Sequence, residues 1–335
     1  MKTRIEQFRD NIGKDIEGYF YLSDFRISSS VKGRYANATI IDRSGIHLAR
    51  MWEESLTERE DELIGKVVRI IGKVTNYDGA PSLIIAVMSE ADSSMYDEAD
   101  IVKVLDNENE KFLVKSIHNA ISSIEDKNLK ELVNTIFSRY QKDFIKLPAG
   151  IRMHHNINGG LLIHTCEVVY LANAYCSIAK TMLPIKEYGY PADKDLVIAG
   201  ALLHDIGKVE EYTGFPGARI TKEGELLGHL NIGVKIVTSV NEGLKEANVG
   251  GISDERLCEL NHIILASHGE ESFIKPKSLE AIIVSRADDF SAMTDFYGVA
   301  ASEDKRVNPN DPAEFFYSKS KGQRFLRKKE IECNV

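Results

Sequence analysis

The sequence predicts a multidomain protein: an N-terminal all-β barrel, a helical connector and a C-terminal all-α domain. Short β-branched runs separated by glycine-bearing turns fill the first 95 residues, and apolar residues recur at helical spacing after them. Seven of the nine histidines lie between residues 154 and 268. A chain of 335 residues is long enough for about two domains. We expect domain boundaries that divide the chain into residues 1–95, 96–149, 150–318 and a basic C-terminal tail, 319–335.

Composition is ordinary for a soluble globular protein, with 43% hydrophobic and 28% charged residues. The net charge of −9 excludes a protein that binds nucleic acid through a positive charge spread over its whole surface. It does not exclude a local basic groove. The longest uninterrupted apolar stretch, residues 196–203, is shorter than the ~20 residues that span a bilayer, so we expect no membrane segment. Four scattered cysteines without CxxC spacing predict reduced thiols and a cytoplasmic protein.

The first 95 residues contain about five short runs with the character of β-strands. Gly45 and the Asp78-Gly79 hairpin signal mark two of the turns between them. This number of strands in so short a segment suits a small barrel such as an OB-fold, and a β-sandwich is the alternative that the pattern leaves open. The expected strands cover residues 19–22, 36–41, 47–52, 67–74 and 82–87.

Helical spacing dominates the rest of the chain. Apolar residues recur at this spacing between Phe112 and Phe137, and Pro148-Ala149-Gly150 interrupts the pattern. We interpret this zone as a connector. Asn158 and Asp193 are expected to cap the first two helices that follow. The expected helices of the last domain cover residues 161–179, 196–206, 229–247, 254–267 and 277–298.

Histidines and aspartates after residue 150 are the strongest chemical signal. His204-Asp205 lies near the end of an apolar helix, where a buried aspartate needs a partner such as a metal ion. His164 shares an apolar helical face with Val168, and a single histidine in such a place is more often a hydrogen-bonded core residue than a metal ligand. Together the residues form an ordered set of imidazoles and carboxylates, typical of Mn, Fe, Co, Ni or Zn sites. The set is His164, His204, Asp205, His229, His268 and Asp288.

This ordered set resembles the H…HD…D signature of the HD-domain superfamily of metal-dependent phosphohydrolases. The segments around it narrow the resemblance to the YhaM type of 3′–5′ exoribonuclease, which joins an N-terminal OB-fold to a C-terminal HD domain. The resemblance therefore extends over nearly the whole chain. The segments that show it are residues 152–156, 159–165, 204–209, 221–229 and 262–269.

The resemblance implies two divalent metal ions, with Mn²⁺ favoured and Co²⁺, Fe²⁺, Ni²⁺ or Zn²⁺ as alternatives. It implies that Asp205 bridges the two ions. The first ion would be held by His164, His204, Asp205 and Asp288, and the second by Asp205, His229 and His268. Two positions depart from the family pattern. Ser267 stands where the family usually has a further histidine, and Ser291 stands where it often has an aspartate.

Further catalytic roles are expected around these ligands. Lys208 could stabilise charge on the phosphate in the transition state, and a lysine that favours the helix dipole is the alternative. His154 and His155 could contact the phosphate or protonate the leaving oxygen, and the alternative is a polar loop. For substrate binding, the candidates are Arg152 as a phosphate clamp and Tyr35 and Trp52 as stacking residues of the barrel.

The leading hypothesis is a metal-dependent 3′–5′ exoribonuclease that hydrolyses single-stranded RNA to nucleoside 5′-monophosphates. One alternative is an HD-domain phosphohydrolase that acts on small nucleotides or cyclic dinucleotides. Another is a nucleic-acid-binding regulator with a structural metal. The sequence leaves open whether single-stranded DNA is also a substrate, whether the chain forms a homo-oligomer, and whether the basic tail is solvated or contacts RNA phosphates.

Overall fold

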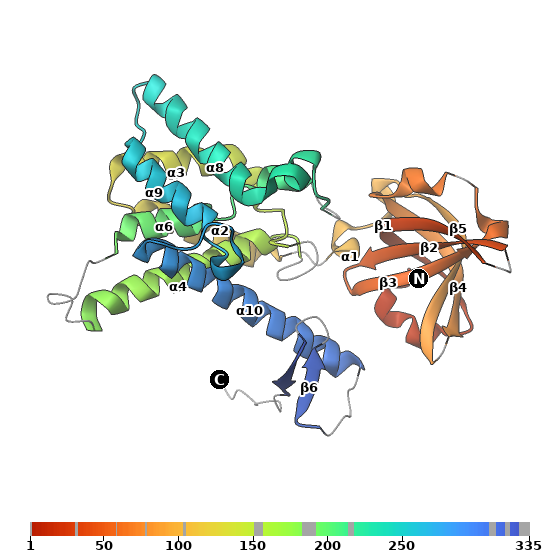
Figure 1. Ribbon diagram of the computed structural model, residues 1–335. Helices are drawn as coiled ribbons and strands as arrows, with labels where there is room; N and C mark the ends of the chain where they lie inside the picture. The colour runs from red at the N-terminus through yellow and green to blue at the C-terminus, as the bar shows by residue number, and fades with distance from the viewer. Residues whose placement is uncertain are drawn as a thin grey trace. The chain divides into compact units, whose positions relative to one another are not determined.

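The structure is a computed structural model. It describes residues 2–30, 33–57, 59–77, 79–102, 105–150, 157–182, 192–213, 218–307, 313–318 and 322–327. Its contacts divide the chain into two compact units, shown in Figure 1. The first unit comprises residues 1–109, 157–159 and 213–219, and the second holds the remaining residues. The boundaries expected at residues 95, 149 and 318 stay predictions.

The first unit is built on a closed barrel with the strand order β1-β2-β3-β5-β4. Neighbouring strands pair antiparallel, except β3 and β5, which pair in parallel. This closure confirms the predicted barrel and excludes the sandwich. Each predicted strand is present and longer than expected. The strands are β1 (Asp15–Ser30), β2 (Gly33–Asp42), β3 (Gly45–Trp52), β4 (Val67–Tyr77) and β5 (Ala80–Glu90).

Strand alternation separates the inside of the barrel from its outer face. On β2, Ala36, Ala38 and Ile40 are fully buried in a core that also contains Phe20 from β1. The side chains between them on β2 point to the outer face, beginning with Tyr35. Six short 3₁₀ segments accompany the two units: Ile5–Gln7, Arg9–Asn11, Glu53–Ser55, Glu60–Leu63, Ser93–Met95 and Gly269–Glu271.

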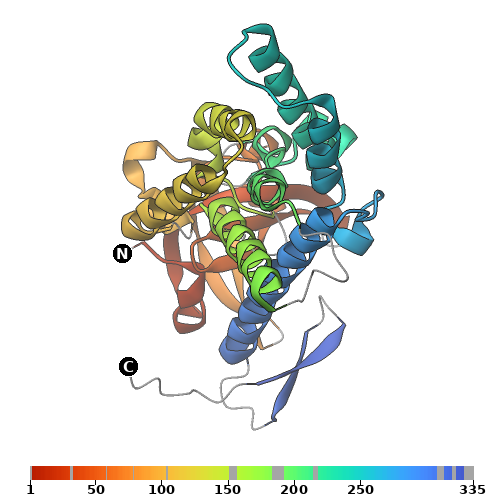
Figure 2. The same cartoon turned by 90° about the vertical axis from the view of Figure 1, so that its left-hand side faces the viewer.

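The second unit is a helical bundle in which α4 and α10 run beside each other and α6 packs against both (Figures 1 and 2). All five helices expected in this part of the chain are present, and Asp193 caps α6 as predicted. Among the described residues, the helices are α1 (Glu98–Ile101), α2 (Asn107–Ser123), α3 (Lys127–Phe144), α4 (Gly160–Met182), α6 (Lys194–Leu203), α7 (Lys208–Glu211), α8 (Lys222–Glu246), α9 (Asp254–Leu265) and α10 (Leu279–Val307).

Helix ends differ from the prediction at functionally important places. The helix expected over 196–206 ends at Leu203, so His204 and Asp205 lie in the turns between α6 and α7. The helix expected over 229–247, α8, begins earlier, at Lys222, and is broken at Gly228, directly before the expected start. The φ of 70° and ψ of 154° at Gly228 suit only glycine. The pattern of apolar residues predicted neither the end of α6 at Leu203 nor the helical segment before Gly228.

By length and composition alone, residues Gly160–Ile178 of α4 could also cross a membrane. This segment carries the fully buried His164 and packs against α6 and α10. Core helices of water-soluble domains pass the same test, and 44% of this window is buried in the structure.

A β-hairpin follows α10 (Figure 1). Strands β6 (Phe315–Ser318) and β7 (Gln323–Leu326) pair antiparallel, and Phe316 packs with Phe296 and Ala300 of α10. The part of the expected tail that the structure describes is therefore a folded strand. Neither the helical spacing of apolar residues nor the basic composition of residues 319–335 predicted this strand pairing.

Candidate metal centre

Five segments of the helical unit bring the six predicted ligands together: α4, the turn after α6, α8, the turn after α9, and α10. The ligand atoms form two groups, within each of which all atoms lie within 4.8 Å of one another. The first, which we call the inner group, is fully buried, and the second, the outer group, is partly exposed at its histidines. The inner group is His164, His204 and Asp288, and the outer group is Asp205, His229 and His268.

The inner group is compact. The Nε2 atoms of His164 and His204 lie 3.2 Å apart, and His164 Nε2 lies 3.0 Å from Asp288 Oδ1. Asp205 Oδ2 lies 3.5 Å from His164 Nε2 and 3.4 Å from His204 Nε2. Asp205 therefore contributes one of its oxygens to this group.

The outer group uses the other oxygen of the same carboxylate. Asp205 Oδ1 lies 3.5 Å from His229 Nε2, and His229 Nε2 lies 2.9 Å from His268 Nε2. A carboxylate that faces one ligand group with each oxygen can bridge two cations. His268, and not Ser267, reaches the centre, so the departure at Ser267 removes no ligand from the outer group.

Hydrogen bonds assign the same tautomer to all four histidines. The acceptors at Nδ1 are a carbonyl, two carboxylates and a hydroxyl whose own proton is donated elsewhere, so each Nδ1 carries the proton. Each Nε2 then presents a lone pair to the centre. The Nδ1 contacts are His204 to Ala201 O (2.8 Å), His229 to Glu211 Oε1 (3.2 Å), His268 to Asp288 Oδ2 (3.0 Å) and His164 to Ser291 Oγ (2.9 Å).

These residues fit divalent cations. When the imidazoles are neutral, the Nε2 lone pairs of His164 and His204 (3.2 Å) and of His229 and His268 (2.9 Å) repel each other, and a bound cation would relieve this repulsion. Asp205 Oδ1 is buried and has no hydrogen-bond partner, although an ionised oxygen in such a place is costly. Imidazole nitrogens combined with carboxylate oxygens suit Mn, Fe, Co, Ni or Zn.

Electrostatics keep the carboxylates ionised. Burial alone would raise the pKa of Asp205, but Lys208 and His204 outweigh it and hold that pKa well below the usual range. Burial would likewise raise the pKa of Asp288, but the contacts of its carboxylate with His164 and His268 outweigh burial and lower that pKa. Burial lowers the pKa of His164, which favours its neutral, ligating form.

Two glycines explain how α8 reaches the centre. A Cβ atom on Gly207 would lie 1.9 Å from the carbonyl oxygen of His229 and 2.6 Å from the nitrogen of Gly233. Only glycine therefore permits this close approach of the turn to α8. The break at Gly228 then frees the backbone N–H of His229, which donates to Glu211 Oε1 at 3.0 Å.

Glu211 is a site residue that sequence reasoning missed. Its side chain is 7% exposed and binds both the backbone N–H and the Nδ1–H of His229. Burial would raise the pKa of Glu211, but its bond to His229 lowers it. Nothing in the sequence distinguishes Glu211 from its neighbour Glu210, so no local signal could have found it.

Lys208 lies where the sequence predicted, with Nζ 2.6 Å from Asp205 Oδ2. It is 3% exposed, so its charge acts on the buried carboxylate of Asp205. Arg152, His154 and His155 lie outside the described residues, and their roles stay predictions.

The outer face of β2 and β3 forms a second candidate site, which we call the aromatic face. Tyr35 and Trp52 are cross-strand partners with ring centroids 6.0 Å apart. The guanidinium of Arg50 lies 5.3 Å from the Tyr35 ring, 5.5 Å from the Trp52 ring and 6.0 Å from that of the exposed Tyr77. Aromatic rings grouped around a cation provide stacking surfaces for bases and a charge for phosphates.

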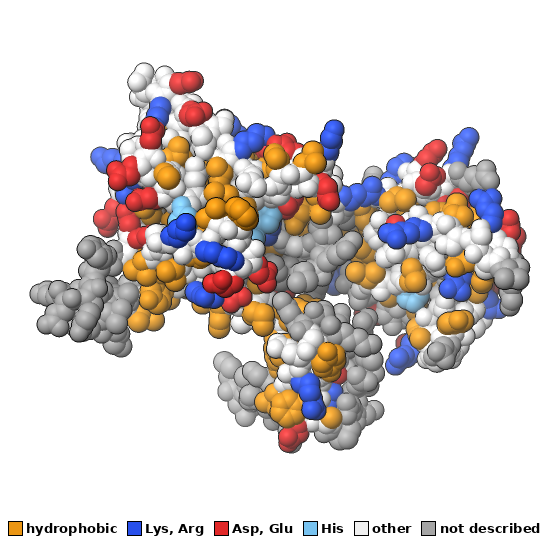
Figure 3. Space-filling view, in the orientation of Figure 1, with side chains coloured by type: hydrophobic (Ala, Val, Ile, Leu, Met, Phe, Trp, Pro, Cys, Tyr) orange, Lys and Arg blue, Asp and Glu red, His pale blue; other side chains and the backbone are white. Residues whose placement is uncertain are grey.

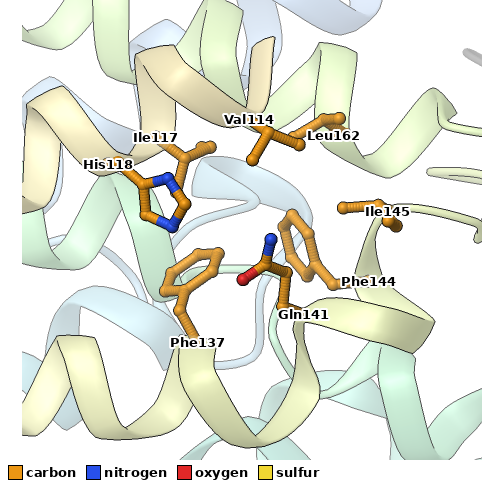
Figure 4. Close-up of a pocket in the computed structure, with 8 residues that line it drawn as sticks. All are labelled: Val114, Ile117, His118, Phe137, Gln141, Phe144, Ile145 and Leu162. Atoms are coloured by element: carbon orange, nitrogen blue, oxygen red, sulfur yellow. The ribbon is translucent and has the colours of Figure 1, made fainter. Parts of the chain in front are cut away.

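Figure 3 shows histidine side chains reaching the surface of the helical unit, beside lysines and arginines. This agrees with the partial exposure of His229 (18%) and His268 (29%). A separate cavity between α2, α3 and α4 is lined mainly by apolar side chains together with His118 and Gln141 (Figure 4). Its volume of about 10 Å³ holds roughly one water molecule, which is too small for a nucleotide.

Residues 161–293, which contain the helices and all six ligand residues of this centre, match the family model described as "HD domain". A second model, TraI_2, described as "Putative helicase", matches residues 96–211. The resemblance expected from the motifs is confirmed by curated relatives. The protein named 3′-5′ exoribonuclease YhaM of Listeria welshimeri serovar 6b is 27% identical over 326 residues, covering 94% of each chain. Its namesake in Listeria innocua serovar 6a is 28% identical over 300 residues, covering 86% of this chain and 88% of its own.

Among solved structures, the second OB-fold domain of replication protein A from Methanococcus maripaludis matches 29% of this chain and all of its own. The identity is 14% and the TM-score is 0.20.

Proposed function

We propose that this protein is a metal-dependent 3′–5′ exoribonuclease that hydrolyses single-stranded RNA to nucleoside 5′-monophosphates. The observation that carries the proposal is the double ligand group, in which Asp205 faces His164 and His204 with one oxygen and His229 with the other. The curated relatives, which match nearly the whole chain and carry the name of that activity, support it.

The ligand residues would hold two divalent ions, with Mn²⁺ as the first choice. Such a pair supplies an activated water and neutralises charge on the phosphoryl oxygens. His164, His204 and Asp288 would hold one ion, and His229 and His268 the other, with Asp205 shared. Figure 3 shows the histidine-bearing surface of this unit, and the partial exposure of the outer group leaves it accessible to a phosphate.

The surrounding residues prepare the ligands and stabilise charge. Lys208 keeps Asp205 ionised through its 2.6 Å contact. Glu211 fixes the ring of His229 by its bonds to Nδ1 and to the backbone N–H. In sequence, His154, His155 and Arg152 precede the first ligand helix, and we propose them for leaving-group protonation and phosphate binding.

The aromatic face would hold the single strand. Stacking on Tyr35, Trp52 and Tyr77 is independent of base identity, because every base has a π-face. Arg50 at the centre of the group would contact a phosphate. Neither base stacking nor a phosphate contact depends on the RNA sequence, so such a surface would suit an enzyme that shortens RNA of any sequence.

We further propose that the protein acts in the cytoplasm and without a membrane. Cys166, Cys176 and Cys258 are free thiols in the structure, which suits a reducing compartment.

The decisive experiment follows a 5′-labelled single-stranded RNA and the matched DNA in Mn²⁺ and resolves the products by length. We expect a ladder that shrinks from the 3′ end, releases nucleoside 5′-monophosphates and stops with EDTA. The variant Asp205→Asn, checked for folding by circular dichroism, should abolish it. Intact RNA together with hydrolysis of a small nucleotide or a cyclic dinucleotide would replace the proposal with a small-substrate phosphohydrolase. Binding of RNA without any hydrolysis would replace it with a regulator.

A further inference from the structure

We propose that Glu167 and Ser291 together position His164 for metal binding, with Ser291 relaying the carboxylate of Glu167 to the imidazole. Ser291 Oγ lies 2.9 Å from His164 Nδ1 and 2.6 Å from Glu167 Oε2. The inference deepens the proposed function and rests on it, because it assigns the residues that prepare one metal ligand.

The direction of the hydrogen bonds follows from the chemistry of the three groups. A serine hydroxyl has one proton, and the carboxylate of Glu167 can only accept it. Ser291 Oγ must then accept the Nδ1–H of His164, which leaves the His164 Nε2 lone pair directed at the centre. A carboxylate at the end of such a chain increases the basicity of the ligand and fixes its tautomer.

The hydrogen bonds of the relay also connect two helices. Glu167 lies one turn after His164 on α4, and Ser291 lies one turn after the ligand Asp288 on α10. The chain of hydrogen bonds therefore joins the two helices that run side by side in Figures 1 and 2 and that each supply an inner ligand. His164 is fully buried and Ser291 is 1% exposed, so bulk water does not compete for the bond between them, while Glu167 is partly buried.

The other three histidines are held differently. His229 and His268 contact the carboxylates of Glu211 and Asp288 directly, and His204 contacts the backbone carbonyl of Ala201. Only at His164 does a hydroxyl stand between the imidazole and the carboxylate. A carboxylate placed at position 291 would take over the direct contact, but it would lie against Glu167 and the two negative charges would repel each other.

This predicts a specific pattern in a set of four variants. Removing the relay in Ser291→Ala, or its charge in Glu167→Gln, should weaken Mn²⁺ binding by about 10- to 100-fold. Ser291→Asp alone should also weaken it, because of the repulsion with Glu167. The double variant Ser291→Asp/Glu167→Gln should bind within a few-fold of the wild type, because a single carboxylate again faces His164.

The test is titration calorimetry of Mn²⁺ into the metal-free full-length chain, which needs no substrate. Ser285→Ala is the matched control, since Ser285 is a buried serine on α10 whose hydroxyl bonds only its own helix backbone at Ile282. We expect unchanged affinity in the control and rescue in the double variant. Wild-type affinity in Glu167→Gln, or a double variant weaker than Ser291→Asp, would overturn the relay.

Failure of the proposed function has a different signature. A wild-type protein that binds Mn²⁺ but leaves RNA intact would refute the exoribonuclease and keep the relay, provided that the variant pattern holds. A wild-type protein with no saturable Mn²⁺ binding would refute both.

Discussion

The Nε2 atoms of His229 and His268 lie 2.9 Å apart on the exposed side of the metal centre. Each ring donates its Nδ1 proton to a carboxylate, Glu211 in one case and Asp288 in the other. In their neutral forms, the two rings therefore direct lone pairs at each other. Binding of a divalent cation by these nitrogens would relieve that repulsion.

The first prediction is that divalent metal stabilises the folded chain. A ligand that binds only the native state at 100 times its dissociation constant adds about 2.7 kcal/mol. This corresponds to a rise in Tm of roughly 5–10 °C for a unit of this size. Thermal unfolding followed by circular dichroism, in EDTA and in a Mn²⁺ series, measures it. A Tm that is the same in EDTA and at saturating Mn²⁺ would refute the metal centre.

The second prediction concerns Gly207→Ala. The added methyl group would meet the carbonyl oxygen of His229 at 1.9 Å, and a backbone atom cannot move aside as a flexible side chain can. The backbone of α8 around His229 must therefore move away from position 207, and this movement displaces the His229 side chain from the metal centre. A displacement of about 1 Å in such a centre costs roughly 100-fold in rate. Gly207→Ala should also lose one of two bound Mn²⁺ ions, as measured by elemental analysis after dialysis.

Gly243→Ala is the matched control for this prediction. Gly243 lies in the same helix, and a Cβ atom there would have no neighbour within 4 Å. Alanine is a better helix former than glycine, so stability should rise by about 0.5–1 kcal/mol with activity unchanged. Equal losses of activity in the two variants would show that α8 is sensitive to substitution in general.

The third prediction concerns Lys208→Met. Lys208 and Asp205 form a buried pair, and removal of one partner from such a pair costs about 3–5 kcal/mol. A bound cation replaces the missing charge, so the Tm difference from the wild type should be large in EDTA and small in Mn²⁺. The exposed pair of Lys235 and Glu223 is the control, and Lys235→Met should leave the Tm nearly unchanged in either condition, because water screens the pair. A deficit independent of metal would assign Lys208 a purely structural role.

The sequence predicted the metal ligands but not the residues that orient them. His204 and Asp205 are adjacent in the chain, and their chemistry is conspicuous after an apolar run. The partners that orient the ligands come from other segments, as with Ser291 of α10 beside His164 of α4. Such contacts exist only after the helices pack, and periodicity within one helix does not encode them. Among these partners, only Glu167 is conspicuous in the sequence, because it is the one charged residue in the apolar stretch that follows Gly160.

The same distinction holds for the fold. The number of strands and their turns predicted the barrel, because these depend on local residue preferences. At the break of α8 at Gly228, the backbone N–H of His229 donates to Glu211 and not to its own helix. This hydrogen bond forms only in the folded chain, so the local sequence does not predict it. Strands β6 and β7 are four residues each, too short for their alternation to stand out from the basic tail.

The fourth prediction is a pH dependence of metal affinity. Burial alone would lower the pKa of His204, but the carboxylates of Asp205 and Asp288 outweigh it and raise that pKa above 6.5. A proton on His204 Nε2 occupies the lone pair that a metal needs. Mn²⁺ affinity should therefore fall as the pH drops through this raised pKa, by roughly tenfold per pH unit below it. Calorimetry at pH 8, 7 and 6, in buffers of different ionisation enthalpy, measures the affinity and counts the released protons. Equal affinity at all three values would contradict the shift.

The fifth prediction separates RNA binding from hydrolysis. Arg50→Ala and Trp52→Ala each remove part of the aromatic face, where Arg50 lies 5.5 Å from the Trp52 ring. A stacked base is worth about 1–3 kcal/mol, so the KM for single-stranded RNA should rise by roughly 5- to 100-fold. Hydrolysis of bis(p-nitrophenyl) phosphate, which has no strand to hold, should keep its rate.

The control for the aromatic face is Tyr170→Ala, which removes a 71% exposed aromatic ring from α4. It should leave the hydrolysis of both substrates unchanged, since no described residue places a second ring or a cation against Tyr170. Raising the salt concentration should weaken RNA binding in the wild type more steeply than in Arg50→Ala, because the variant has lost one phosphate contact. If Arg50→Ala and Trp52→Ala lowered the rates on both substrates equally, the aromatic face would serve the stability of the barrel and not the binding of the strand.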